Sequence, residues 1–449
     1  MSDAHPPTKP ATFREVFAAR EFRALYSAAV LSWVGDYMAK AAVTVMVYRE
    51  TDSVALSAAA FAISYLPWLV GGPVLSAIAE RSPYRTVMVV CDLIRMVLIA
   101  LVAVPGMPIW AMLVLLFATT LANPPSQAAK SALLPLILPG DRLVVAISLN
   151  SSTSQAAQVA GYVAGAAIAT TSPRTALIID AVTFAVSALI IWCGVAHRPP
   201  AMSGDRRSHL ARETAEGFTI VFGSPVLRAI ALLVFTAMLF AIVPEGLAAA
   251  WAEQRSTSVA DRGLAQALIM AASPLGFILG GLVIGRGVRP DRRRALVRPF
   301  AVLAPLALVP TLLDPPPVVV ALLAATCGFA VAGLLPVANG LFVQALPHGY
   351  RARAFGVMAT GIQVMQGVAV FATGLLADRY PLPAVVGLWS LAGVGAMLLC
   401  ALRWPDAERF AAAIAAASEA NGTSVATPPT QAAPPRSTAA PETAREGAS

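Results

Sequence analysis

Charged residues are scarce in this sequence. Asp, Glu, Lys and Arg make up 12% of its 449 residues, whereas 57% of the residues are hydrophobic. Because soluble domains carry about 25% charged residues, this composition excludes an ordinary soluble protein. The mean hydropathy is +0.71. The chain is therefore interpreted as a membrane protein that crosses the bilayer many times.

Cysteine and histidine are also rare, and neither occurs in a metal-binding pattern. The four histidines lie near the N-terminus or in predicted loops, and the four cysteines lie far apart in apolar runs. No glycine-rich loop precedes a Lys-Ser or Lys-Thr pair, which excludes a P-loop for ATP. We therefore predict no enzyme activity, no metal and no cofactor. The cysteines are Cys91, Cys193, Cys327 and Cys400.

The N-terminus lacks the apolar run of a secretory signal. Residues 1–23 are polar, with prolines and charges of both signs. We therefore expect no cleavable signal peptide and interpret 1–23 as a cytoplasmic N-terminal segment.

Long apolar runs are abundant, and they predict an all-α membrane protein with twelve transmembrane helices. The predicted spans are 24–48, 54–79, 86–104, 109–124, 144–169, 175–195, 227–251, 263–285, 297–313, 318–340, 354–377 and 383–403.

The basic residues gather on one side of this topology. With the N-terminus in the cytoplasm, 25 of the 32 Lys and Arg residues fall in cytoplasmic segments. The positive-inside rule thus explains the net charge of +8, and nucleic acid is not needed as a partner. We predict a multi-pass protein of the plasma (inner) membrane, with both termini cytoplasmic.

An internal repeat divides the twelve spans into two pseudo-symmetric halves. Gly71-Gly72-Pro73-Val74 recurs as Gly280-Gly281-Leu282-Val283 at an offset of 209 residues, and Arg85 recurs as Arg294 at the same offset. Such a duplication is typical of transporters. The predicted organisation is a six-helix bundle at 24–196, a cytoplasmic linker with an amphipathic helix at 197–226, a six-helix bundle at 227–403, and a largely disordered cytoplasmic tail at 404–449.

Charged residues in the first and seventh predicted spans are candidates for function. Asp36 lies twelve residues into the first run, about 18 Å deep, and Lys40 follows it by one helical turn. Either the two form a structural ion pair, or Asp36 faces a central cavity and exchanges a proton. The 209-residue offset carries Asp36 onto Glu245, where Pro244 and Gly246 indicate a local bend. Asp36 and Glu245 are the candidates for proton coupling, and Lys40 is a candidate cavity residue.

A polar stripe follows one face of the fifth span. Asn150, Ser154 and Gln158 recur every four residues, so they share a face. A polar face is unfavourable against lipid and predicts either a substrate cavity or contact with another helix. Further polar residues in the tenth and eleventh spans are also cavity candidates, namely Asn339, Gln363 and Gln366.

Five segments, taken in order, resemble one known family. They are "GGPVLSAIAERSPYRTVMVVCDLIR" (71–95), "NPPSQAAKSALLPLILPGDRL" (123–143), "LIIDAVTFAVSAL" (177–189), "SPVLRAIALL" (224–233) and "ALPHGYRARAFGV" (345–357). Together they resemble the macrolide-efflux and enterobactin-exporter branch of the major facilitator superfamily, over about residues 22–403.

The resemblance implies a cytoplasmic gating motif between the second and third spans. It comprises Gly72, Glu80, Arg81 and Arg85, with Asp92 and Arg95 behind it; the alternative is a loop whose charges only fix topology. The sequence departs from the family at Ser76 and Glu80, where the pattern has Gly and Asp, and at Tyr162, where it has proline.

Three acidic or basic residues elsewhere are interpreted as structural. Asp180, within the family-like "LIIDA" segment, is expected to be one. "GLLADR" at 374–379 copies the gating motif on the extracellular side, and Asp378 and Arg379 are expected to be ordinary interfacial charges.

The function that the resemblance implies is export of a small organic molecule (a drug, siderophore or metabolite) by proton antiport with alternating access. The expected partners are the lipid bilayer, the small-molecule substrate and protons, and the expected state is a monomer. The alternatives are a proton-coupled importer and a membrane receptor or scaffold that does not transport.

Overall fold

A computed structural model describes residues 12–67, 82–199, 210–347 and 350–425. Every regular element among these residues is helical. The helices before the linker are α1 (Phe13–Ala18), α2 (Arg20–Thr51), α3 (Val54–Ala62), α6 (Tyr84–Val102), α7 (Ile109–Leu121), α8 (Asn123–Ile137), α9 (Asp141–Thr171) and α10 (Pro173–Gly194).

The remaining elements begin with the helix of the linker. They are α11 (Leu210–Gly223), α12 (Pro225–Ala241), α13 (Val243–Arg255), α14 (Val259–Gly287), α15 (Pro290–Leu306), the 3₁₀ helix η1 (Val309–Leu313), α16 (Pro317–Gln344), α17 (Arg351–Ala377), α18 (Leu382–Leu402) and α19 (Ala407–Val425).

Serine side chains cap several of these helices at their N-termini. Ser53, Ser172, Ser224 and Ser258 each accept a hydrogen bond from the backbone N–H three residues on. Such caps satisfy amide groups that have no partner within the helix. Proline follows Ser172 and Ser224 directly, at the first helical position, where its missing N–H costs nothing. The connections α9–α10 and α11–α12 are therefore fixed by Ser-Pro pairs.

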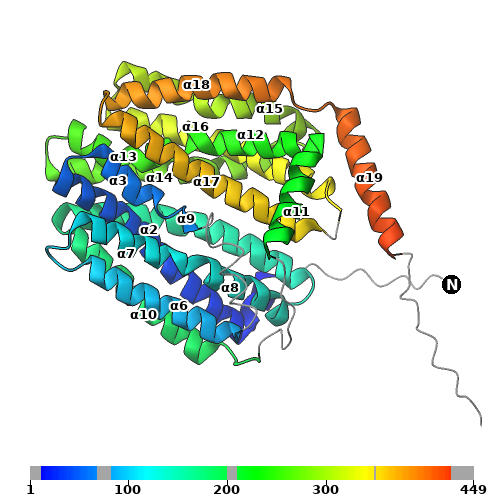
Figure 1. Cartoon of the computed structure of the whole chain (residues 1–449), viewed down its shortest axis with the longest axis horizontal. Helices are drawn as coiled ribbons and strands as arrows, with labels where there is room; N and C mark the ends of the chain where they lie inside the picture. The colour runs from blue at the N-terminus through cyan, green and yellow to red at the C-terminus, as the bar shows by residue number, and fades with distance from the viewer. Residues whose placement is uncertain (1–11, 68–81, 200–209, 348–349, 426–449) are drawn as a thin grey trace, which may run out of the picture.

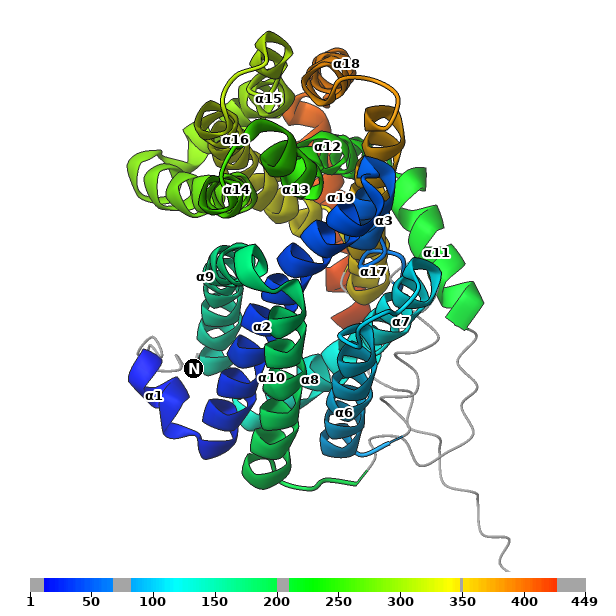
Figure 2. The ribbon, with the colours of Figure 1, turned by 90° about the vertical axis from the view of Figure 1, so that its left-hand side faces the viewer.

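The helices form two groups with a shared junction (Figure 2). In the first group, α2 packs against α9 and α10, and α6 packs against α8 and α10. In the second group, α16 packs against α14 and α15, and α12 packs against α17 and α18. The junction is made by α9 against α14 and by α3 against α17. Figure 1 shows the second group above the first.

Small residues allow the two groups to approach closely. A side chain at Gly374 of α17 would collide with Ala58 of α3, and one at Gly263 of α14 would collide with Thr170 of α9. Within membranes, such small-residue contacts give helices their packing energy. Close packing at Gly374 and Gly263 thus helps to set the position of the junction.

Nine stretches of the described residues are long and apolar enough to cross a membrane. They are Arg20–Thr51, Ile109–Ile137, Pro173–Gly194, Pro225–Arg255, Val259–Gly287, Arg292–Leu313, Pro317–Gln344, Arg353–Ala377 and Leu382–Leu402.

Three of the twelve predicted spans are not among these nine. The span 54–79 runs into residues 68–81, outside the described part of the chain. The span 86–104 corresponds to α6, which carries three charged residues, and 144–169 lies within α9, which carries the polar stripe. The count of twelve, like the division at 24–196 and 227–403, stays a prediction.

The segments predicted as the linker and the tail each contain a helix. The amphipathic helix expected in the linker is α11, which packs on α17, and Glu216 there forms an ion pair with Arg353 at 2.7 Å. The helix α19 occupies part of the segment 404–449 that we expected to be largely disordered. Its many alanines favour a helix, and residues 426–449 lie outside the described ones.

Candidate functional site

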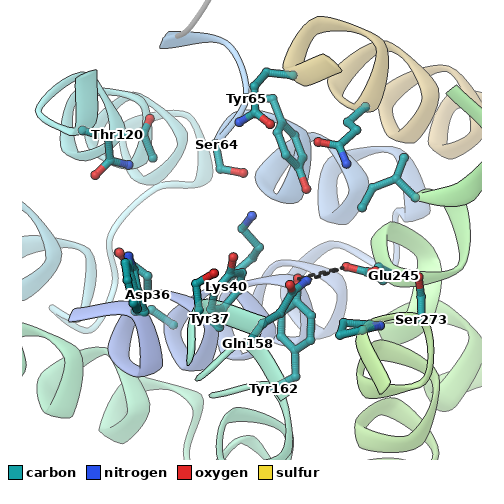
Figure 3. A pocket seen from close by; sticks show the side chains of 18 of the residues that line it. Asp36, Tyr37, Lys40, Ser64, Tyr65, Thr120, Gln158, Tyr162, Glu245 and Ser273 are labelled. Atoms are coloured by element: carbon teal, nitrogen blue, oxygen red, sulfur yellow. Dashed lines mark hydrogen bonds between the residues drawn. The ribbon is translucent and has the colours of Figure 1, made fainter. Parts of the chain in front are cut away.

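A cavity of about 600 Å³ lies between the two groups of helices (Figure 3). Its walls come from α2, α3, α6, α7, α9 and α10 of the first group, and from α12, α13, α14, α16 and α17 of the second. This volume is within the range of about 300–1,000 Å³ typical of small-molecule sites.

Seven of the nine residues predicted for proton coupling or for the substrate cavity line this cavity. They are Asp36, Lys40, Ser154, Gln158, Glu245, Gln363 and Gln366. Asn150 and Asn339 do not. The carboxamide oxygen of Asn150 is buried with no hydrogen-bond partner among the described residues. Asn339 is half-buried on α16, one turn beyond the last cavity-lining residue of that helix, Leu335.

Asp36 forms an ion pair across helices. Its carboxylate accepts a hydrogen bond from the guanidinium of Arg95, which comes from α6. The Arg95 side chain is 4% exposed and its guanidinium lies 4.0 Å from the ring centre of Phe184, on α10. A planar guanidinium can pair with a carboxylate and stack on a ring at once. Arg95 therefore links α2, α6 and α10 at the cavity wall.

Lys40 points into the cavity from the same helix as Asp36 (Figure 3). Its ammonium nitrogen lies 4.7 Å from the ring centres of Phe61 and Tyr65, and 5.8 Å from that of Tyr37. Such cation–π contacts stabilise a charge that has lost part of its water. Within the described ranges, no carboxylate lies within ion-pair distance of Lys40.

Of the two alternatives for Asp36, the structural ion pair with Lys40 is therefore wrong. Spacing along one helix showed that the two side chains share a face, but it could not show what the neighbouring helices present to them. Arg95 of α6 pairs with the carboxylate, and the ammonium lies over the rings of Phe61 on α3 and of Tyr65 just after that helix. Asp92, three residues before Arg95 on α6, accepts a hydrogen bond from Ser187 of α10 at 2.7 Å.

Glu245 stands at the junction of the two groups. The helix breaks at Ile242, between α12 and α13, and Pro244 lies in the first turn of α13; the predicted bend is confirmed. Gly246 packs directly on Val370 of α17. Glu245 is 4% exposed and accepts hydrogen bonds from Tyr162 at 3.1 Å and from Gln158 at 3.3 Å, both on α9. Figure 3 shows Ser273 beside it.

Tyr162 is a site residue that sequence reasoning missed. It stands four residues after Gln158, so it continues the stripe of Asn150, Ser154 and Gln158 by one more turn. The signal was present in two forms, because Tyr162 also replaces the proline of the family pattern. The ring of Tyr37 contacts it edge-on at 5.3 Å.

The predicted gating residues are only partly visible. Gly72, Glu80 and Arg81 lie outside the described residues. Arg85 stacks on Trp192 at 4.4 Å and donates a 3.4 Å hydrogen bond to the carbonyl of Val195, near the end of α10. Asp92 is fully buried between α6 and α10, and Arg95 lines the cavity. The gating role of these residues stays a prediction.

Asp378, expected to be an ordinary interfacial charge, joins the two groups. Its carboxylate accepts hydrogen bonds from the Ser53 hydroxyl at 2.8 Å and from the Ala55 backbone N–H at 3.0 Å. Both donors belong to the first turn of α3, where a carboxylate also interacts favourably with the helix dipole. The end of α17 is thereby fixed to the start of α3.

Other polar contacts join the groups at this same end of the molecule. Glu253 of α13 pairs with Arg49 of α2 at 2.7 Å and with Arg262 of α14 at 2.9 Å. The Gln254 amide donates to the Tyr48 hydroxyl at 3.2 Å. With the Asp378 contacts, these bonds hold the two groups together at the end where α2 meets α3, which we call the α2–α3 end.

The described residues contain no cluster of His, Cys, Asp and Glu that could hold a metal ion. The cavity instead offers carboxylates, cations, amides and aromatic rings. These groups can bind an organic molecule and protons.

Comparison with known proteins places the chain in a family. The sequence profile of the Major Facilitator Superfamily matches residues 25–370. Macrolide efflux protein A of Streptococcus pyogenes is 22% identical over 390 residues, which cover 85% of this chain and 94% of that protein.

Solved structures agree on the fold. A mutant of the nucleoside transporter NupG superposes with a TM-score of 0.66 at 15% identity, covering 87% of this chain and 99% of that one. A bacterial homolog of the human lysosomal transporter Spinster, in an inward-facing and occupied conformation, gives 0.64 at 14% identity, covering 92% and 98%. Family and fold are those of transporters rather than enzymes, and the chain belongs to the Major Facilitator Superfamily.

Proposed function

We propose that this transporter exports a small organic molecule in exchange for protons, and that Glu245 carries a coupled proton. The observation that carries the proposal is the position of Glu245, a buried carboxylate in the cavity that accepts hydrogen bonds from Tyr162 and Gln158 of the opposite group of helices. Within the described chain, no cation lies within ion-pair distance of it. Its charge is therefore free to change.

The charge of Glu245 bears directly on the junction. When ionised, it accepts charge-assisted hydrogen bonds from Tyr162 and Gln158, which are about twice as strong as neutral ones. Protonation weakens this link between α9 and α13. A proton can thus shift the balance between two arrangements of the helix groups, which is what alternating access requires.

Export is the direction favoured by the relative named for macrolide efflux. The aromatic rings, amides and charges of the cavity suit a molecule with both apolar and polar parts. We further expect the protein to act as a monomer in the plasma (inner) membrane.

The test is transport into proteoliposomes with a labelled macrolide as the first compound, followed by other drugs, siderophores and metabolites. An antiporter moves its substrate toward the acidic side, so vesicles with an acidic interior should accumulate it. Protein-free liposomes correct for passive trapping of weak bases. Accumulation toward the alkaline side would indicate a symporter and would contradict the proposed exchange.

The topology makes a separate prediction. Because most basic residues lie in predicted cytoplasmic segments, Asp205→Cys in a cysteine-free background should react with an impermeant maleimide only after cells are opened. Labelling of residue 205 in intact cells would place the linker outside and overturn the orientation.

The contacts of Asp378 predict a gate at the α2–α3 end. Asp378→Ala removes two hydrogen bonds, and the loss of a helix cap costs about 1 kcal/mol, or about a fivefold shift between closed and open states. A cysteine at Ala60, which lines the cavity, should then react faster with an impermeant reagent added from outside.

The matched control is Arg255→Ala. Arg255 pairs with Asp314 at 2.7 Å, and both residues belong to the second group. This change should leave the labelling rate at residue 60 unaltered. The labelling rate at residue 60 is compared in the otherwise unchanged protein, in Asp378→Ala and in Arg255→Ala. Equal rates in these three proteins would show that Asp378 does not hold the α2–α3 end closed.

A further inference from the structure

Three aromatic rings surround the ammonium group of Lys40 in the cavity. The ring centres of Phe61 and Tyr65 lie 4.7 Å from its nitrogen, and that of Tyr37 lies 5.8 Å away. All three distances are within the reach of about 6 Å over which the face of a ring attracts a cation. Proteins use such groups of rings to bind quaternary ammonium ligands. We call these three rings the ring site.

Contacts other than Lys40 hold the ring site in place. Phe61 is fully buried, and its ring packs against that of Tyr65 at 5.9 Å. A side chain at Gly367 of α17 would contact the Cβ of Tyr65 at 3.3 Å, so Tyr65 packs on the second group of helices. The ring of Tyr37 packs edge-on against that of Tyr162 at 5.3 Å. A site whose groups are already ordered costs less entropy to bind.

Lys40 is not the cation that suits these rings best. Its ammonium is compact and strongly hydrated, so it loses more hydration on the rings than an alkylated ammonium does. In the described part of the chain it has neither an ion pair nor a hydrogen bond to offset this loss. Its advantage is its attachment to α2, which keeps it beside the rings at a high effective concentration. Because its four-carbon stem is flexible, a better cation can displace it.

The cavity also offers a second position for the ammonium of Lys40. Glu245 lines the same cavity, and no cation of the described chain lies within ion-pair distance of it. The ring of Tyr37 contacts both Lys40 and Tyr162, and Tyr162 donates a hydrogen bond to Glu245 at 3.1 Å. When another cation takes the ring site, Lys40 can turn towards this carboxylate. The two cations then do not have to share the rings.

The second group of helices gives the cavity an apolar wall. Met238, Ile242, Phe277 and Leu335 line it there, whereas Lys40 and the ring site belong to the first group. A ligand that contacts both groups therefore needs an apolar body as well as a cationic end.

We propose that the ring site binds the alkylated ammonium group of an amphipathic organic cation, and that Lys40 competes with this group for the rings. The substrate class is thus an amine or quaternary ammonium with an apolar body. That such a cation is the transported compound rests on the proposed function, but the competition for the ring site does not.

The test is isothermal titration calorimetry of the purified protein with hexyltrimethylammonium bromide, below the concentration at which this probe forms micelles. Lys40→Met removes the competing ammonium, so it should bind the probe about tenfold more tightly than the wild type. Lys40→Arg keeps a cation that stacks on rings, and it should bind the probe no more tightly than the wild type. In Lys40→Met, hexylammonium should bind more weakly than hexyltrimethylammonium, because its ammonium is more strongly hydrated.

Two controls separate the ring site from a general effect of charge. The double variant Lys40→Met with Phe61→Leu also lacks the lysine but has lost a ring, so most of the gain in affinity should disappear. Hexanol is uncharged and should bind the wild type and Lys40→Met equally.

Equal affinity of hexyltrimethylammonium for the wild type and Lys40→Met would overturn the proposal. A gain that persists in the double variant would also overturn it, because the gain would then not depend on the rings. Binding at equilibrium needs no pH gradient, so a failure of pH-driven export would leave this result standing, and the reverse also holds.

Discussion

Arg95→Met is expected to lower the amount of folded protein sharply. The change leaves Asp36 without its cation, in a cavity that already contains a second aspartate close by. Removing one partner of a fully buried pair costs about 3–5 kcal/mol. Because the Asp36 side chain is 34% exposed to the cavity, we expect a smaller loss of about 1–3 kcal/mol. The loss of stability is measured by heating the purified protein and following the fraction that stays unaggregated by size-exclusion chromatography.

The double variant Asp36→Asn with Arg95→Met is the control for this prediction. It removes both charges, so most of the stability should return. Lys40→Met should have a smaller effect on folding than Arg95→Met, because Lys40 contacts rings rather than a carboxylate. A loss from Lys40→Met equal to that from Arg95→Met would favour the rejected pair of Asp36 with Lys40.

Glu245→Gln is expected to abolish accumulation driven by a pH gradient, down to the level of protein-free liposomes. Glutamine keeps the shape of the protonated acid but cannot release a proton. Exchange of labelled for unlabelled substrate across the membrane needs no net proton movement, so it should survive. Both assays use the same proteoliposomes, which separates a loss of coupling from a loss of binding.

Asp314→Asn is the matched control for Glu245→Gln. Asp314 is an acid of the same helix group, outside the cavity, and asparagine tolerates its left-handed backbone at φ 55°. This variant should keep both activities. Loss of exchange as well as accumulation in Glu245→Gln would assign Glu245 to substrate binding instead of proton coupling.

Much of this architecture could be predicted because apolar runs and basic loops follow directly from the bilayer. The repeat was equally informative, since the offset that relates Asp36 to Glu245 was visible in sequence, and both residues line the cavity. The bend at Glu245 could be predicted because proline and glycine flank it.

The partners of these residues could not be predicted. Helical periodicity says which residues share a face, but not which helix meets that face. Asp36 therefore had Lys40 as its only visible partner, while Arg95 lies 59 residues away in sequence. The interpretation of Asp180 as structural came from the family-like "LIIDA" segment and stays a prediction.

The hydrogen-bond donors of Asp378, at the end of α17, could not be predicted either. Its position in a copy of the gating motif was clear from sequence, but its donors, Ser53 and Ala55, come from the start of α3. A contact over more than 300 residues leaves no local signal in a single sequence.

The central claim is that substrate and protons move in opposite directions through this cavity. It is tested most directly by loading proteoliposomes with a pH-sensitive dye and adding a transported compound outside at equal starting pH. As the compound enters, protons should leave, so the interior should become alkaline with the wild type and stay unchanged with Glu245→Gln. Entry of the compound with no change of internal pH in the wild type, or with acidification, would contradict the account.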